Sequence, residues 1–141
     1  MHVNIGDIIL AKYLDFNGTV EDGLFLVYSK DNYWLSKMRS FSALKVCTNP
    51  LSYQVPISKK QYPFLDHDSY INCSCQQRFK EVDPENVTEF TKISKLGSVN
   101  SYTLDKVRKQ LRNFNKDVDE QLQTAIEQYN SIAKNVYNSI R

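Results

Sequence analysis

Between Val3 and Leu96 the chain consists of short apolar stretches separated by turn-forming residues, which predicts a series of β-strands. The Asn17-Gly18 pair predicts a tight turn after the first stretch. Short strands at this spacing favour a small barrel or a strongly coiled sheet, because closing a sheet removes its exposed edges. The strands are expected at residues 5–13, 24–28, 43–48, 53–57 and 69–79.

After Gly97 apolar residues recur every three or four positions, which predicts one amphipathic helix over residues 104–140. Ser101 or Thr103 is expected to cap its N-terminus. A helix of that length would span about 55 Å, whereas a body of about 100 residues has a radius of gyration of about 13 Å. The body is therefore expected to cover only part of the apolar stripe, which consists of Val107, Leu111, Phe114, Val118, Leu122, Ile126, Tyr129, Ile132, Val136 and Ile140.

Two arrangements would remove the uncovered stripe from water. The helix could break near residues 113–117 and fold back, or its distal half could bury its apolar side against another chain. The stripe keeps its phase through this region, which favours a continuous helix and a partner. The residues predicted to bind that partner are Leu122, Ile126, Tyr129, Ile132 and Val136.

Composition indicates one ordinary domain with an extension, because 141 residues with 41% hydrophobic content suffice for a core. The net charge of +2 is too small to indicate a nucleic-acid or membrane partner by itself. The N-terminus lacks the pattern of a secretory signal, and three cysteines in a chain of this size favour free thiols. We therefore expect a soluble cytoplasmic protein without a membrane partner.

Several short motifs occur in an order that resembles the PemK and MazF toxin family, whose members are small SH3-like barrels. The motifs are Gly6 to Leu10, which begins with Gly-Asp, then Leu24 to Ser29, Val46 to Thr48, Asp68 to Cys73, and Leu96 to Val99 before the helix. In the family the last of these is a glycine turn that leads into the helix. The resemblance covers residues 5 to about 112 and implies an α+β protein. It places a PemK/MazF-type barrel with the start of the helix in residues 1–114 and a helical extension in residues 115–141.

The resemblance also implies a function, because such toxins are typically homodimeric endoribonucleases that need no metal or other cofactor and pair with an antitoxin. Cleavage requires a ribose 2′-hydroxyl to attack the adjacent phosphate while cationic groups stabilise the developing charge. The family's Arg-Pro pair corresponds here to Gly23 and Leu24, preceded by Glu21 and Asp22. The resemblance thus implies an RNA-directed endoribonuclease with an altered active site. The alternative is an inactive relative that binds an antitoxin or other regulatory protein through its barrel groove and helix.

Three residues are candidates for catalysis. Thr48 and Ser69 match hydroxyl positions of the family, although hydroxyls beside turns commonly bond the local backbone. His67, between Asp66 and Asp68, is the better of two histidines for proton transfer, although three consecutive polar residues also indicate a simple loop.

Single-stranded RNA would need cations and aromatic rings along its path. The cationic candidates are Arg39, Arg78, Lys106, Lys109 and Arg112, and the last three share a helix face that solvation alone would also explain. The candidates for base stacking are Tyr13, Phe16, Tyr28, Tyr33 and Trp34.

Cys47, Cys73, Cys75 and His67 offer the donor types of a zinc site but lack a paired CxxC, so buried free cysteines are favoured.

Overall fold

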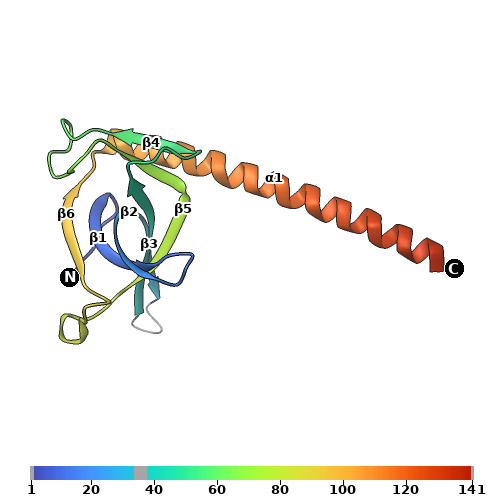
Figure 1. The fold of residues 1–141 in the computed structure, drawn as a ribbon, viewed down its shortest axis with the longest axis horizontal. Coiled ribbons are helices and arrows are strands. Elements are labelled where there is room, and N and C mark those ends of the chain that lie inside the picture. Colours follow the sequence, from blue (N-terminus) through green and yellow to red (C-terminus); the bar gives the residue numbers. More distant parts are fainter. Residues whose placement is uncertain (1, 34–37, 141) are drawn as a thin grey trace.

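The computed structural model describes residues 2–33 and 38–140, with only the backbone at residues 32, 33 and 38 (Figure 1). The side chains of Tyr33 and Trp34, two candidates for base stacking, lie outside the described part. Six strands precede one long helix in the described residues. The sequence pattern predicts the helix and five of these strands, but not the strand at residues 93–98. The elements are β1 (Asp7–Leu14), β2 (Val20–Tyr33), β3 (Met38–Cys47), β4 (Gln54–Ile57), β5 (Ser69–Glu81), a 3-10 turn η1 (Pro84–Asn86), β6 (Ile93–Ser98) and α1 (Ser101–Ile140).

The strands form one antiparallel sheet in the order β4-β5-β3-β2-β1-β6. The sheet curls strongly on itself, while α1 starts beside β4 and β5 and runs away from the body (Figure 1). The edge strands β4 and β6 do not pair with each other among the described residues, so the sheet is a half-barrel. The predicted α+β class and the curled sheet are thereby confirmed.

Both faces of the central strands are apolar, because neighbouring residues point to opposite sides of a strand. Ile8 and Leu26 belong to a helix-side core, which also contains Val107 and Leu111 of α1. Their immediate neighbours in sequence, Ile9 and Phe25, belong instead to a second core on the opposite face. This core also contains Phe41 and Phe79, among others. We call this second cluster the aromatic core, since the rings of Phe25 and Phe79 meet edge to face with their centroids 5.0 Å apart.

Asn100 caps the helix, so the prediction of Ser101 or Thr103 as the cap is wrong. The Asn100 side-chain oxygen accepts a hydrogen bond from the backbone N–H of Thr103 at 2.9 Å, as an N-cap residue does. The Thr103 hydroxyl is buried and bonds the Tyr62 hydroxyl at 2.6 Å, which ties the first turn of α1 to the loop after β4.

The helix is continuous from Ser101 to Ile140, which excludes the break considered near residues 113–117. Tyr53 makes the last contacts between the body and α1, because its ring packs on Phe114 and its hydroxyl donates to the Asp117 carboxylate. Tyr53 also has a φ of 59°, a left-handed conformation that non-glycine residues seldom adopt. From Val118 to Ile140 every residue of the helix is exposed.

The Gly6-Asp7 motif has a structural role at the start of β1. Gly6 has a φ of +97°, and its carbonyl oxygen accepts from the N–H of Val99 at 2.9 Å. The buried Asp7 carboxylate accepts from the Ser98 hydroxyl at 2.8 Å and pairs with Lys95 at 3.1 Å. This motif therefore joins β1 to β6 immediately before the helix begins.

Gly97 lies inside β6, so the expectation that it forms a turn before the helix is wrong. A Cβ atom at this position would lie 2.4 Å from two ring carbons of Phe64. The glycine therefore gives room to an aromatic ring from the loop between β4 and β5.

We predict that Gly97→Ala lowers the free energy of unfolding by about 1–3 kcal/mol, because the added methyl group must displace the Phe64 ring. Chemical denaturation of both proteins measures the difference. Adding Phe64→Ala to the Gly97→Ala variant removes the clash, so the double variant should lose less stability than the two single losses combined. Purely additive losses would contradict this account.

Candidate functional site

The three residues expected to be catalytic lie at one end of the β3–β5 strand pair. Cys47 pairs with Tyr70, so Thr48 and Ser69 each lie one residue further toward this end. His67 precedes Ser69 by two residues, in the segment before β5. The fold therefore brings Thr48, Ser69 and His67 into one region.

Within this region the polar groups bond the local backbone. Ser69 is buried, and its hydroxyl donates to the carbonyl oxygen of His67 at 2.9 Å. Asp68 accepts from the backbone N–H of Lys59 at 2.8 Å. The His67 and Thr48 side chains are exposed, and neither reaches Ser69 through a side-chain hydrogen bond in the described part of the chain. This geometry is that of a polar turn and does not form a nucleophile–base pair.

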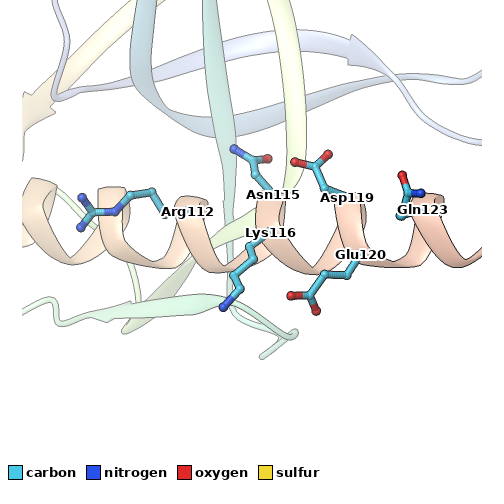
Figure 2. A pocket seen from close by; sticks show the side chains of 6 residues that line it. All are labelled: Arg112, Asn115, Lys116, Asp119, Glu120 and Gln123. Atoms are coloured by element: carbon cyan, nitrogen blue, oxygen red, sulfur yellow. The ribbon is translucent and has the colours of Figure 1, made fainter.

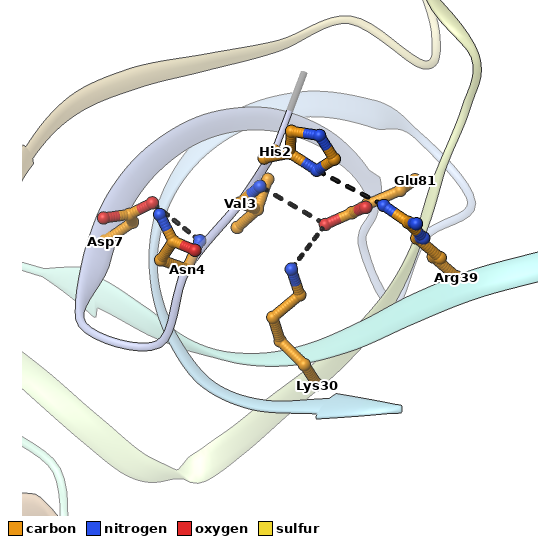
Figure 3. A network of polar contacts seen from close by, with 7 residues as sticks. All are labelled: His2, Val3, Asn4, Asp7, Lys30, Arg39 and Glu81. Atoms are coloured by element: carbon orange, nitrogen blue, oxygen red, sulfur yellow. Dashed lines mark hydrogen bonds and ion pairs between the residues drawn. The ribbon is translucent and has the colours of Figure 1, made fainter. Parts of the chain in front are cut away.

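Arg39 lies at the opposite end of β3, about 26 Å from Cys47 at about 3.3 Å per residue. Its guanidinium lies 3.3 Å from the ring of His2 (Figure 3). Beside it, the Glu81 carboxylate accepts from the backbone N–H of Val3 at 3.3 Å. Arg39 thus belongs to a network that holds the N-terminal segment, far from Thr48 and Ser69.

Arg78 lies on the same half of β5 as Glu81, and its charge is partly compensated. The guanidinium donates to the Asp31 carboxylate at 2.7 Å and to the Ser40 hydroxyl at 2.9 Å. The side chain remains 55% exposed, so it still contributes to the charge of the surrounding surface.

The helix cations Lys106, Lys109 and Arg112 are exposed on the part of α1 that covers the body. Arg112 lines a shallow hollow of the helix surface together with Asp119 and Glu120 (Figure 2). Carboxylates thus follow the cations along this face. A phosphate backbone would meet both signs of charge, so this strip fits a solvated helix face better than an RNA path.

Gly23, which the resemblance aligns with the family's arginine, is the fourth residue of β2 and lies under the ring of Tyr13. A Cβ atom at Gly23 would lie 2.8 Å from a Tyr13 ring carbon and 3.0 Å from a Phe25 ring carbon. The rings of Tyr13 and Phe25 meet edge to face with centroids 5.4 Å apart. Any side chain at position 23 would therefore displace Tyr13, which explains why an arginine is incompatible with this packing.

Lys45 supplies a cation beside the same tyrosine. Its Nζ atom donates to the Tyr13 hydroxyl at 2.6 Å and lies 4.7 Å from the centroid of the ring. This hydrogen bond raises the pKa of Lys45 above its ordinary value of 10.5, so the ammonium group stays charged at neutral pH. Because Lys45 pairs with Phe25, which lies two residues after Gly23, the cation is close to the position that the resemblance aligns with the family's arginine.

Sequence reasoning missed Lys45 because no motif surrounds it. A lysine within an apolar strand is usually taken for a solvent-facing residue of that strand. Lys45 is placed beside Tyr13 by the β2–β3 register, and this register cannot be read from the sequence.

A groove of about 440 Å³ opens beside Tyr13, between the β1–β2 hairpin on one side and β5 with the segment before β6 on the other. The aromatic residues that line it in the described part of the chain are Tyr13, Phe79 and Phe90, and Phe90 is 67% exposed. Phe79 also belongs to the aromatic core, so the groove floor is part of the folded body. Sequence reasoning named Tyr13 for base stacking but not Phe79 or Phe90.

Among the described residues, the charged ones that line the groove are all cationic, namely Lys12, Arg78, Lys80 and Lys92. Lys12 pairs with Asp22 at 3.0 Å and Arg78 pairs with Asp31, whereas Lys80 and Lys92 form no ion pair within the described residues. The groove therefore has a positive lining, and Arg78 is the one predicted RNA-binding residue that lines it.

Of the two acidic residues that precede Gly23, only Glu21 has, within the described part of the chain, an uncompensated charge on the Tyr13 face that would repel an incoming phosphate. Asp22 is paired with Lys12 across the β1–β2 hairpin, which compensates its charge. Asp22 and Gly23 point to opposite faces because neighbouring strand residues alternate. Only Glu21, whose strand partner is Tyr13, lies on the Tyr13 face, and it does not line the groove.

The cysteines do not gather around His67. Cys73 is buried in the helix-side core, and its thiol donates to the carbonyl oxygen of Val107. Cys47 and Cys75 are half-buried. The β3–β5 register shifts between Asn72 and Gln76, so Cys73 and Cys75 need not point to the same face, as residues two apart in a regular strand would. Among the described residues no group of three or more His, Cys, Asp or Glu side chains is placed to hold a metal ion.

Burial raises the pKa of the Cys73 thiol from 9.0 to about 11. We predict that iodoacetamide at mildly alkaline pH modifies Cys47 and Cys75 in the folded protein and spares Cys73, because the thiolate is the reactive form. Mass spectrometry of the modified peptides measures this difference. Equal modification of Cys73 and Cys75 would contradict it.

The same shift predicts a change of stability with pH. The unfolded chain forms the Cys73 thiolate at lower pH than the folded protein does. The free energy of unfolding should therefore fall as the pH rises from about 9 to about 11, by up to about 2–3 kcal/mol from this group. Denaturant titrations at the two pH values, with Cys73→Ala as the control that lacks this contribution, measure it.

Comparison with models of protein families and with curated proteins found no match for the chain. In the described part of the structure no helix has the length and apolar content needed to cross a membrane.

Proposed function

We propose that the protein is a PemK/MazF-like toxin component with an SH3-like barrel that binds and cleaves single-stranded RNA. In this proposal the altered active site uses Lys45 in place of the family's arginine. The groove carries the proposal, since aromatic rings and cations line it and none of its described lining residues has a carboxylate. The order of strands followed by a C-terminal helix supports the assignment to this family.

The groove suits a single strand because bases stack on aromatic faces while cations follow the phosphates. Phe90 and Tyr13 offer rings at the groove surface, and Lys80 and Lys92 offer uncompensated charge beside them. A duplex would keep its bases stacked on one another and could not use these rings. The preferred ligand is therefore RNA with unpaired bases.

Cleavage would proceed by attack of a ribose 2′-hydroxyl on the adjacent phosphorus, with departure of the 5′ oxygen of the next nucleotide. The Lys45 ammonium would stabilise the negative charge that develops on the phosphate oxygens. The Tyr13 oxygen accepts a hydrogen bond from Lys45, which leaves the hydroxyl proton of Tyr13 to donate to the same phosphate. The residues described around the groove include no histidine and no carboxylate, so proton removal from the 2′-hydroxyl would depend on solvent.

A second candidate function is that of a protein-binding module without catalysis, which would pair with an antitoxin or other regulatory protein. The specific observation in its favour is the long exposed apolar side of α1. Absence of the family's arginine, which Gly23 makes incompatible with the packing, also favours it.

Reversing the charge of the groove should weaken RNA binding. The double variant Lys80→Glu, Lys92→Glu is expected to bind a fluorescent single-stranded RNA at least about tenfold more weakly, with a smaller salt dependence. The matched control is Lys106→Glu, Lys109→Glu on α1, which should bind like the unmodified protein. If the helix variant loses affinity and the groove variant does not, the groove is not the binding site.

Removing the Lys45 charge should abolish cleavage while leaving binding largely intact. We expect Lys45→Met to cleave single-stranded RNA about 10²–10³-fold more slowly without added metal, and Lys45→Arg to retain part of the activity. The rate should rise with pH between about 6 and about 9, because hydroxide replaces a general base while Lys45 stays charged. If the folded protein binds RNA without cleaving it, the catalytic part fails and the second candidate stands.

A further inference from the structure

The distal half of α1 has an apolar side that nothing in the described structure covers. Its large residues are between 44% exposed, at Ile126, and 78% exposed, at Ile140. On this side six positions, one of them a small alanine, are spaced alternately four and three residues apart, which is the core pattern of a packed helix pair, and Ile132 lies beside them. The six positions of this pattern are Leu122, Ile126, Tyr129, Ala133, Val136 and Ile140.

This pattern is complementary to itself when a second copy lies antiparallel, with Ser131 of the two copies at the same level. Leu122 then meets Ile140 of the other copy, and Ile126 meets its Val136. Tyr129, the largest of the six, meets Ala133, the smallest. Every layer therefore combines one residue from each half of the pattern, and the one bulky aromatic ring meets the one small side chain.

The two charged residues between positions 121 and 140 also fit an antiparallel copy. They are Glu127 and Lys134, and the antiparallel register brings Glu127 to within one residue of the level of Lys134 of the other copy. A parallel pair would instead place Glu127 level with Glu127 and Tyr129 level with Tyr129. Ile132 would meet Ile132 of the second copy beside the two-fold axis, which adds an apolar contact.

The two bodies also leave room for the antiparallel arrangement. The last contact of the body on α1 is at Asp117, and the helix beyond it runs clear of the sheet (Figure 1). In the antiparallel register the two Asp117 residues would lie about 42 Å apart along the helix axis. In a parallel pair both bodies, each with a radius of gyration of about 13 Å, would crowd the same end of two helices about 10 Å apart.

We propose that residues 122–140 form an antiparallel two-helix interface with a second copy of this chain, centred on Ser131. This interface is independent of the RNA groove and lies beyond the part of the chain that resembles the toxin family. It gives a dimer whose two grooves are at opposite ends of a helical rod.

The mass of the full-length protein in solution tests the interface first. Light scattering across a dilution series should show a reversible dimer. Ala133→Tyr places two rings opposite each other and should weaken dimerisation at least about tenfold, whereas the outward-facing Ser131→Tyr should not change it. Tyr129→Ala together with Ala133→Tyr exchanges the two sizes and should restore dimerisation. A monomer at all concentrations, or a dimer insensitive to Ala133→Tyr, would overturn the proposal.

The direction of the helices needs a distance measurement. Nitroxide spin labels on single cysteines at Ser131 or Asn138, in a Cys47→Ser, Cys75→Ser background, give label-to-label distances in the dimer. In the antiparallel pair the Asn138 labels are separated by about 21 Å along the axis and the Ser131 labels by almost nothing along it. The Asn138 distance should therefore be clearly longer than the Ser131 distance. Equal distances at both positions would show a parallel pair and overturn the proposed register.

Discussion

The architecture depends on one constraint, which is that the central strands are apolar on both faces. Ile8 and Ile9 are adjacent in β1, and each is fully buried on a different side of the sheet. One face is covered by the first turns of α1 and by the loop between β4 and β5. No separate layer within the described residues covers the other face, so the sheet curls over its own rings and over Val3 of the N-terminal segment. A flat sheet would leave one of the two cores in water.

The same curl shapes the candidate site. It brings the end of the β1–β2 hairpin opposite β5 and the segment before β6, so residues distant in sequence line one groove. Gly23 allows the Tyr13 ring to lie against the sheet, and that ring in turn accepts the hydrogen bond of Lys45. The cation near the groove is thus fixed by packing in the aromatic core.

The sequence predicts those features that depend on local patterns. Apolar stretches located five of the six strands, and the constant phase of the stripe favoured the continuous helix that is observed. β6 was not expected as a strand, because Gly97 resembled a turn residue and the Phe64 ring that needs its space comes from a distant loop. The cap at Asn100 was missed because Ser101 and Thr103 are equally suitable by residue type, and only the backbone geometry distinguishes them.

The site was less predictable than the fold because it depends on strand register and on curvature. Arg39 and Arg78 look alike in sequence, yet one holds the N-terminus and the other lines the groove. Thr48, Ser69 and His67 do lie together, but the bond from the Ser69 hydroxyl to a backbone carbonyl depends on the turn geometry. Lys45 and Phe90 carry no sequence signal at all. Their importance follows only from which residues face them across the sheet.

The exposed side of α1 is also a consequence of where the body stops. Tyr53 fixes the helix by a ring contact and a hydrogen bond, and no described part of the body extends past Asp117 to cover the remaining turns. Burying the exposed half of one large apolar side chain contributes about 1 kcal/mol, so five such residues from each of two copies contribute about 10 kcal/mol. Association costs about 4–15 kcal/mol in lost freedom. These magnitudes nearly balance, so a helix pair of this length would be a reversible contact whose population depends on protein concentration, and not a permanent extension of the core.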